Sequence, residues 1–219
     1  MKRRCVFAPG ERYHVYNRGN SKQKIFLDFK DYDRCLDLLY FANSNSPVRM
    51  EEIFSLQLSQ RTGDALVDIH AFCLMPNHFH LLLTEKEDGG IQRFVQKFST
   101  AYAMYFNKKY KRAGSLFEGR FKARHADKEI YLKYLMSYIH LNPVKLLQSD
   151  WKEKGIHNKK NAYLFVKKYN YSSLKEFQSG QYHICTPVLF NTIFKTSASI
   201  EKELFTWLTY GKETEQTIQ

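Results

Sequence analysis

The sequence predicts an α+β fold in which an antiparallel sheet is covered by helices. Two apolar stretches within residues 66–84, separated only by a short turn, predict a pair of adjacent strands. Runs of apolar residues at helical spacing lie before and after this pair. The chain has 219 residues, of which 43% are hydrophobic and 16% aromatic, so it is long and apolar enough to fold around a core.

The first part of the chain shows a strand pattern and then a helix pattern. Residues 12–18 alternate in polarity, which predicts a strand with His14 and Tyr16 on one of its faces. Residues 28–42 carry apolar side chains at close to helical spacing. Residues 48–64 fit either a short helix or an edge strand, and we expect a connector there.

The most apolar stretch of the sequence carries two histidines. His78 and His80 flank Phe79, and the residues from Phe79 to Leu83 are otherwise apolar, which predicts a strand buried on both faces. Residues i and i+2 of a strand point to the same side. The two imidazoles therefore face one way and could converge on a single ion.

The second part of the chain adds a helix, a strand and a further helix. The clearest helix pattern runs from Ile91 to Phe106, residues 118–126 alternate like a strand, and residues 128–142 form a helix pattern that stops at Pro143. The first six elements match a ferredoxin-like layout, an antiparallel sheet with two helices on one face. The last helix is additional and could cover part of the other face.

We place a boundary after residue 145. Residues 1–145 hold the predicted sheet and the added helix, which carries Tyr138. Residues 146–219 are expected to form a lysine-rich segment and a C-terminal helical extension, whose last helix spans residues 200–210.

Charge and cysteine content bear on partners and location. Lys and Arg number 34 against 22 Asp and Glu, and the net charge of +12 favours a polyanionic partner, nucleic acid before a membrane. A basic protein that is merely soluble is the alternative. The four cysteines are far apart, no apolar run reaches the roughly 18 residues of a membrane span, and the N-terminus lacks a signal-peptide pattern. We therefore expect a reduced cytoplasmic protein.

The histidine pair by itself has three interpretations. The first is a core pair satisfied by backbone hydrogen bonds. The second is a zinc hydrolase, which usually has an Asp and another His close by, whereas Leu81, Leu82 and Leu83 follow here. The third is two histidines completed by oxygen ligands from elsewhere, a set that suits Mg²⁺ or Mn²⁺ acting on a phosphate.

A second cluster lies on the last helix of the predicted sheet domain. Tyr131, Tyr134, Tyr138 and Asn142 share one helix face. Tyrosines at this spacing are usually core residues, but Asn142 lies one turn beyond Tyr138 and could place an oxygen ligand beside a nucleophile. Pro143 disfavours helical geometry at Asn142 and leaves the direction of its side chain open.

Five short motifs follow one another in a specific order. They are Tyr13-His-Val-Tyr-Asn-Arg-Gly19, Leu74-Met-Pro-Asn-His-Phe-His-Leu-Leu82, Gly119-Arg-Phe121, Tyr138-Ile-His-Leu-Asn-Pro143 and Tyr171-Ser-Ser173. This order resembles the HUH-type single-tyrosine transposases of small bacterial insertion sequences, and most closely the REP-associated tyrosine transposases. The resemblance covers residues 10–178, but the lysine-rich segment near 152–168 and the residues after 180 depart from the pattern.

The resemblance implies a site and a reaction. His78, His80 and Asn142 would hold a divalent metal, Mg²⁺ or Mn²⁺, and Tyr138 would attack single-stranded or hairpin DNA to form a 5′-phosphotyrosine link. A 3′-OH could reverse that link, so strands could be rejoined without ATP. A homodimer and a place near the bacterial nucleoid are further expectations.

Two basic groups are expected to follow the DNA backbone. They are Arg120, Lys122 and Arg124 on one face of the predicted strand, and Lys108, Lys109 and Arg112 around the end of the preceding helix. A solvated charged face is the alternative for each of them.

Two other functions stay open at this point. One is a DNA-binding protein of the same fold that recognises structured single strands without catalysis. The other is a metal-dependent nuclease in which water attacks and Tyr138 is structural. The intact His-x-His motif together with the tyrosine counts against a pure binding protein.

Overall fold

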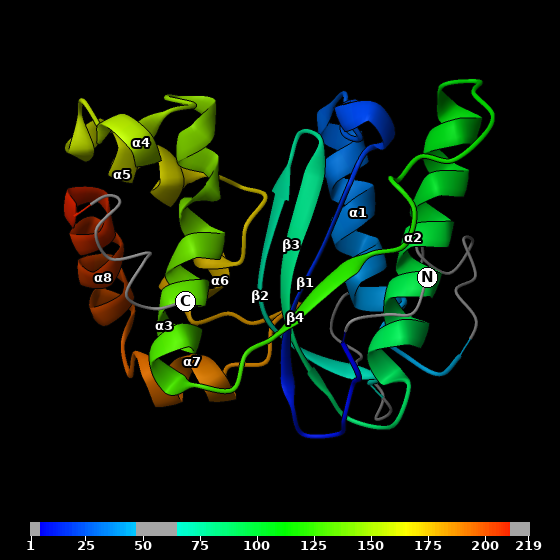
Figure 1. Cartoon of the computed structure of the whole chain (residues 1–219), viewed down its shortest axis with the longest axis horizontal. Coiled ribbons are helices and arrows are strands. Elements are labelled where there is room, and N and C mark those ends of the chain that lie inside the picture. Colours follow the sequence, from blue (N-terminus) through cyan, green and yellow to red (C-terminus); the bar gives the residue numbers. More distant parts are fainter. Residues whose placement is uncertain (1–4, 47–64, 211–219) are drawn as a thin grey trace.

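A four-stranded antiparallel sheet lies between two layers of helices in the computed structural model of the chain, which describes residues 5–46 and 65–210 (Figure 1). One layer holds α1 (Phe29–Phe41) and α2 (Gly90–Lys109), and the other holds α3 (Glu129–Leu141) with the C-terminal helices. The predicted α+β fold is thereby confirmed. The connector expected at 48–64 lies outside the described residues.

The sheet has the strand order of the predicted ferredoxin-like layout. Its strands are β1 (Arg12–Arg18), β2 (Val67–Met75), β3 (His78–Glu85) and β4 (Lys122–His125). They pair antiparallel in the order β2-β3-β1-β4, which places β1 between β3 and β4. Within the range 118–126, where the sequence predicts a strand, only β4 is regular. Phe117, just before this range, forms an isolated bridge with Gly19.

Strand β3 is buried on both faces, as its composition predicts. The ring of Phe79 packs edge-on against Phe98 of α2, with ring centroids 5.3 Å apart. Because side chains alternate along a strand, Phe79 and Leu81 face α1 and α2, while His78 and His80 face the layer that holds α3. The one-sided placement expected for the two histidines is therefore present.

The helices of the first layer are held by a cap and by aromatic packing. Asp28 caps α1, and its side chain accepts a hydrogen bond from the backbone N–H of Asp31 at 3.1 Å. Helix α2 buries Phe94, Phe98 and Tyr102 against the sheet and α1. Aromatic rings at helical spacing thus form the core of this side of the molecule.

The second layer follows β4 along the chain. After α3 come η3 (Asn142–Leu146), α4 (Trp151–Lys154), α5 (Lys159–Lys168), α6 (Leu174–Ser179), α7 (Val188–Ile193) and α8 (Ser197–Tyr210); a short helix η1 (Asn20–Lys22) follows β1. The helix predicted over 200–210 thus begins three residues earlier, at Ser197. Helix α3 contacts β2, β3 and α8.

The C-terminal part returns to the free edge of β2. The backbone N–H of Leu74 donates to the carbonyl of Tyr171 at 2.8 Å, and that of Ser173 donates to the carbonyl of Phe72 at 3.0 Å. Buried residues of α5, α6 and α8 belong to the same hydrophobic core as the sheet. The boundary after residue 145 stays a prediction.

None of the helices within residues 5–46 and 65–210 combines the length and the apolar character that crossing a membrane requires.

Candidate active site

The two histidines of β3 lie on the same face of the sheet as His14, Tyr16 and Arg18 of β1. In the register of this strand pair, Tyr16 lies opposite His80 and Arg18 opposite His78. His14, two residues before Tyr16, shares their face of the sheet. His14 and His80 are both buried, with 7% and 6% of their surface exposed.

Both histidines of the His-x-His motif use Nδ1 in a hydrogen bond. Nδ1 of His78 lies 2.6 Å from Oδ1 of Asn77, and Nδ1 of His80 lies 2.8 Å from Nε2 of His14. An amide oxygen only accepts, so the proton of His78 resides on Nδ1 and its Nε2 keeps a lone pair. A histidine in this state is ready to bind a metal through Nε2.

Burial keeps these imidazoles neutral. Burial, aided by the charges of Lys145 and Arg18, lowers the pKa of His78 to about 4. Burial and the charge of Arg124 lower the pKa of His14 to about 3, and burial lowers the pKa of His80 well below its usual value. At neutral pH each of these imidazoles therefore has one N–H and one nitrogen lone pair.

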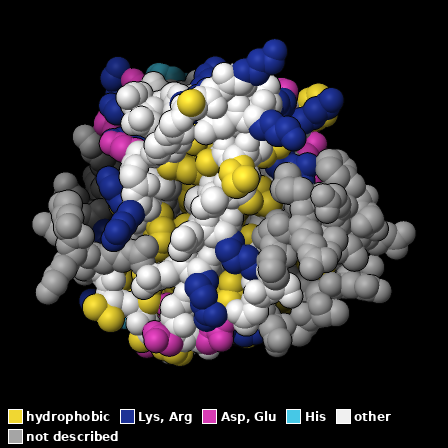
Figure 2. Space-filling view, turned by 90° about the vertical axis from the view of Figure 1, so that its right-hand side faces the viewer, with side chains coloured by type: hydrophobic (Ala, Val, Ile, Leu, Met, Phe, Trp, Pro, Cys, Tyr) yellow, Lys and Arg dark blue, Asp and Glu magenta, His cyan; other side chains and the backbone are white. Residues whose placement is uncertain are grey.

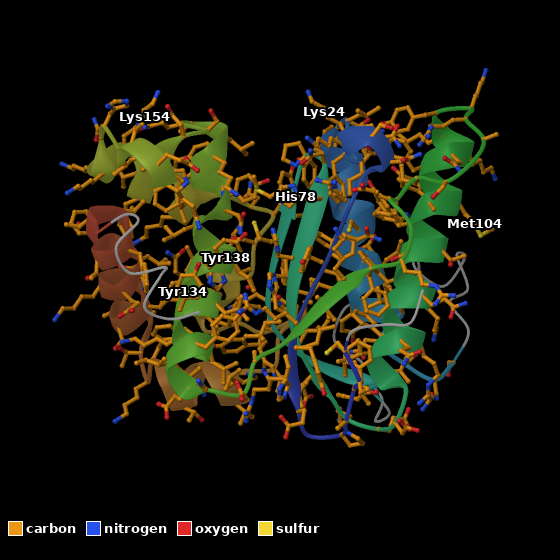
Figure 3. The ribbon with its side chains drawn as sticks, in the orientation of Figure 1. Lys24, His78, Met104, Tyr134, Tyr138 and Lys154 are labelled. Carbon is orange, nitrogen blue, oxygen red and sulfur yellow. The ribbon has the colours of Figure 1, made fainter. Side chains whose placement is uncertain are left out.

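Helix α3 brings Tyr138 to the histidines. The ring centroid of Tyr138 lies 5.5 Å from that of His80 and 6.0 Å from that of His14, edge to face in both cases. Figure 3 shows Tyr138 and Tyr134 on α3, and His78 at the start of β3. Tyr138 is only partly buried.

Asn142 is the C-terminal cap of α3 and lies one helical turn beyond Tyr138. Its side chain Nδ2 donates to the carbonyl of Tyr138 at 2.9 Å, while its buried Oδ1 has no hydrogen-bond partner among the described residues. The helical backbone of Asn142, with φ −51° and ψ −40°, differs from the expectation for a residue before proline. Here the chain continues as η3 with Pro143 in its first turn, where a missing N–H costs no hydrogen bond.

These groups fit a divalent metal. A buried amide oxygen without a partner is costly unless something binds it, and metal binding would satisfy Oδ1 of Asn142. Two neutral imidazoles and an amide oxygen form a donor set that leaves coordination positions open. Among the described residues, no group of three or more His, Cys, Asp or Glu has the arrangement of a metal site.

The sequence did not predict a role at this site for His14, Lys145 or Lys152. His14 lies on the face of β1 that the alternation predicted, but its contact with His80 depends on strand pairing. Nζ of Lys152, from α4, lies 4.5 Å from the ring centroid of Tyr138, and the charge of Lys145 acts on His78 and His80. Neither lysine stands in a local sequence pattern that would have singled it out.

The basic residues of β4 border this site. Lys122 pairs with Tyr16 and Arg124 with His14, so both share the face that carries His80. The guanidinium of Arg124 lies 5.3 Å from the ring centroid of Tyr131 of α3. Lys122 and Arg124 could therefore contact DNA that enters the site. Arg120, exposed just before β4, instead lines a pocket with Gln92 and Gln96 of α2, so the structure does not place it with the other two.

The other predicted basic group lies in the layer of α1 and α2, across the sheet from Tyr138. Lys109 forms ion pairs with Asp28 at 2.8 Å and Asp31 at 2.6 Å, and Arg112 lies 5.7 Å from the ring of Phe106. Lys108 is exposed. Figure 2 shows this side of the molecule, where Lys and Arg side chains are interspersed with Asp and Glu. The structure does not bring this group to the candidate active site.

Comparison with known proteins finds a similar family and a shared fold. Residues 42–142 match the family described as IS200-like transposases, a range that includes both histidines, Tyr138 and Asn142. A solved REP-associated tyrosine transposase bound to a REP hairpin has a TM-score of 0.52 and 16% identity, with 85% of this chain and 90% of that chain covered. This likeness shows a shared fold.

A second solved structure is a provisionally assigned transposase from Deinococcus radiodurans. Its TM-score is 0.36 and its identity 17%, with 62% of this chain and 93% of that chain covered. No curated protein matches the sequence. Residues 42–142 of the chain thus resemble the IS200-like transposases, and the chain shares the fold of a REP-associated tyrosine transposase.

Proposed function

We propose that this protein cleaves and rejoins single-stranded DNA through a covalent link to Tyr138, with a divalent metal held by His78, His80 and Asn142. The substrate would be a strand that carries a hairpin, as in the solved structure of similar fold. The observation that carries the proposal is the 5.5 Å separation of the His80 and Tyr138 rings, which come from a strand and a helix far apart in the sequence.

His78, His80 and Asn142 would act as metal ligands, as their surroundings suggest. His78 and His80 would each offer a lone pair, and Asn142 would offer the buried Oδ1 that has no partner among the described residues. The bound Mg²⁺ or Mn²⁺ would supply Lewis-acid polarisation of the scissile phosphate. Asn142 also donates to the carbonyl of Tyr138, so the proposed ligand holds the end of the helix that carries the nucleophile.

The covalent step conserves the phosphodiester. The hydroxyl oxygen of Tyr138 attacks phosphorus, the bond from phosphorus to the 3′-oxygen breaks, and the 5′ end stays on the tyrosine as a phosphate ester. The 3′-oxygen leaves and takes up a proton, while the proton of Tyr138 passes to solvent. Attack by another 3′-OH reverses these steps and joins new ends without ATP.

The charges around the site would orient the DNA. Lys122 and Arg124 lie on the same sheet face as His80, and Nζ of Lys152 lies over the ring of Tyr138. A strand that passes between β4 and α4 would thus meet positive charge on both sides of the tyrosine. Light scattering would test the expectation of a homodimer.

One experiment separates this proposal from its alternatives. The protein is incubated with hairpin-bearing single-stranded DNA and Mn²⁺, and a protein–DNA adduct is sought on a denaturing gel. We expect an adduct with the wild type and none with Tyr138→Phe. Tyr134→Phe, one turn earlier on α3, is the matched control and should still form the adduct.

Other results would point elsewhere. Cleavage that needs Mn²⁺ but survives Tyr138→Phe would indicate a nuclease in which water attacks. Binding without cleavage by the wild type would indicate a binding protein of the same fold. For the metal ligands, Asn142→Ala should weaken Mn²⁺ binding measured by calorimetry at least about tenfold, since a second-shell change already costs this much.

A further inference from the structure

We propose that His14 is a positioning residue that holds His80 in the tautomer able to bind the metal through Nε2. The inference rests on the proposed function, which makes His80 a metal ligand. It adds a third histidine, outside the His-x-His motif, to the working parts of the site.

The contact between the two rings is short and enclosed. Nε2 of His14 lies 2.8 Å from Nδ1 of His80, and the ring centroids are 5.0 Å apart with the planes inclined by 22°. The ring of Tyr138 lies edge-on to both. Arg124 lies opposite His14 on β4. The strand register therefore fixes the two imidazoles against each other.

A hydrogen bond between two neutral imidazoles needs one N–H and one lone pair, so only two arrangements are available. If His14 donates, then Nδ1 of His80 accepts and Nε2 of His80 carries the proton, which prevents that nitrogen from binding a metal. If His80 donates from Nδ1, its Nε2 keeps the lone pair. Only the second arrangement is compatible with His80 as a ligand.

This choice also defines the state of His14. Its Nε2 must accept from His80, so its own proton resides on Nδ1. The Nε2 lone pair is then occupied, and His14 cannot bind the same metal through that atom. His14 therefore serves the ligand and is not itself a third imidazole ligand.

His78 is held in a matching way. Its Nδ1 donates to Oδ1 of Asn77 at 2.6 Å, which leaves Nε2 open as well. Metal-binding histidines are often oriented by a carboxylate, but here both orienting groups, an amide and an imidazole, are neutral. The proposed metal ligands and the groups that orient them would thus add no negative charge. The full charge of the metal would then act on the phosphate.

The tautomers can be observed in the metal-free wild-type protein. Long-range ¹H–¹⁵N NMR of ¹⁵N-histidine-labelled protein distinguishes protonation at Nδ1 from protonation at Nε2. We expect Nδ1–H for both His80 and His14. Protonation of His80 at Nε2 would overturn the inference, and this measurement needs no variant that could fail to fold.

Calorimetric titration with Mn²⁺ alone tests the consequence. His14→Leu should weaken Mn²⁺ binding by about 10- to 100-fold, and His14→Gln, which keeps an acceptor, should recover part of it. His125→Leu, on the neighbouring strand with an exposed histidine, is the control and should match the wild type.

The outcomes of this titration are distinguishable from failure of the proposed function. If the wild type binds Mn²⁺ and His14→Leu binds it equally well, only the role of His14 is refuted. If the wild type binds no Mn²⁺, the proposed metal site itself is refuted, and the role of His14 with it.

Discussion

Nε2 of His140 lies 2.8 Å from Oγ of Ser173, and both side chains are fully buried. Oγ of Ser173 also accepts from the backbone N–H of Phe72 at 2.9 Å. Ser173 therefore connects β2 to His140, which lies on α3 two residues beyond Tyr138. This bond gives the Tyr171-Ser-Ser173 motif a physical role, because it fixes the tyrosine helix to the sheet that carries the histidines.

Replacing Ser173 with Ala should destabilise the protein by about 2 kcal/mol, because it leaves buried partners on His140 and Phe72 unsatisfied. Urea unfolding monitored by circular dichroism would measure the change. Ser179→Ala, at an exposed serine of α6, should alter the free energy of unfolding by less than about 0.5 kcal/mol. Equal effects of the two changes would refute the connecting role of Ser173.

Lys122 and Arg124 should contribute charge to DNA binding without reading sequence. Replacing either by Ala should weaken single-strand binding and lower the slope of log Kd against log salt concentration by about 0.7. Fluorescence anisotropy at several salt concentrations would measure this. Lys30→Ala, an exposed lysine in the layer of α1 and α2, should leave the slope unchanged. An unchanged slope for the β4 variants would place the DNA elsewhere.

Lys109 should matter more for stability than for DNA binding. It pairs with Asp31, whose side chain is fully buried, so Lys109→Met would leave a buried charge without its cation. We expect a loss of about 3 kcal/mol in the free energy of unfolding, measured by urea titration. Lys108→Met, at an exposed neighbour, should have little effect. Weaker DNA binding by Lys109→Met at unchanged stability would favour the DNA-contact role that the sequence predicts.

Stability should fall in mild acid in part through His70. Burial lowers the pKa of His70 to about 4, opposed by the charge of Asp68 and aided by that of Arg12, and its Nε2 lies 2.6 Å from Oγ1 of Thr84. The unfolded chain takes up this proton near pH 6.5, so the folded state loses stability as the pH falls from about 6.5 to about 4.

The contribution of His70 should amount to about 3 kcal/mol over that interval, since each pKa unit corresponds to about 1.4 kcal/mol. Unfolding free energies at pH 7, 5 and 4 would show it as a steeper decline in the wild type than in His70→Gln. His157→Gln, at an exposed histidine, should decline as the wild type does. Parallel curves for the wild type and His70→Gln would contradict the prediction.

Local periodicity determined a large part of this fold in advance. The alternation along β3 places His78 and His80 on one face whatever the strand packs against, and helical spacing places Tyr138 and Asn142 on one side of α3. The element order predicted the ferredoxin-like sheet. These features depend on residues close together in the chain, so composition and spacing suffice to predict them.

Contacts between distant elements could not be obtained in this way. The pairing of β1 with β3 joins His14 to His80 across 66 positions, and the return of the chain to β2 joins His140 to Ser173 across 33. The position of Lys152 over Tyr138 and the ion pairs of Lys109 likewise come from packing. The sequence by itself determined which side chains share a face, whereas only the tertiary structure decided which faces meet, because strand register and helix docking depend on the burial of the whole core.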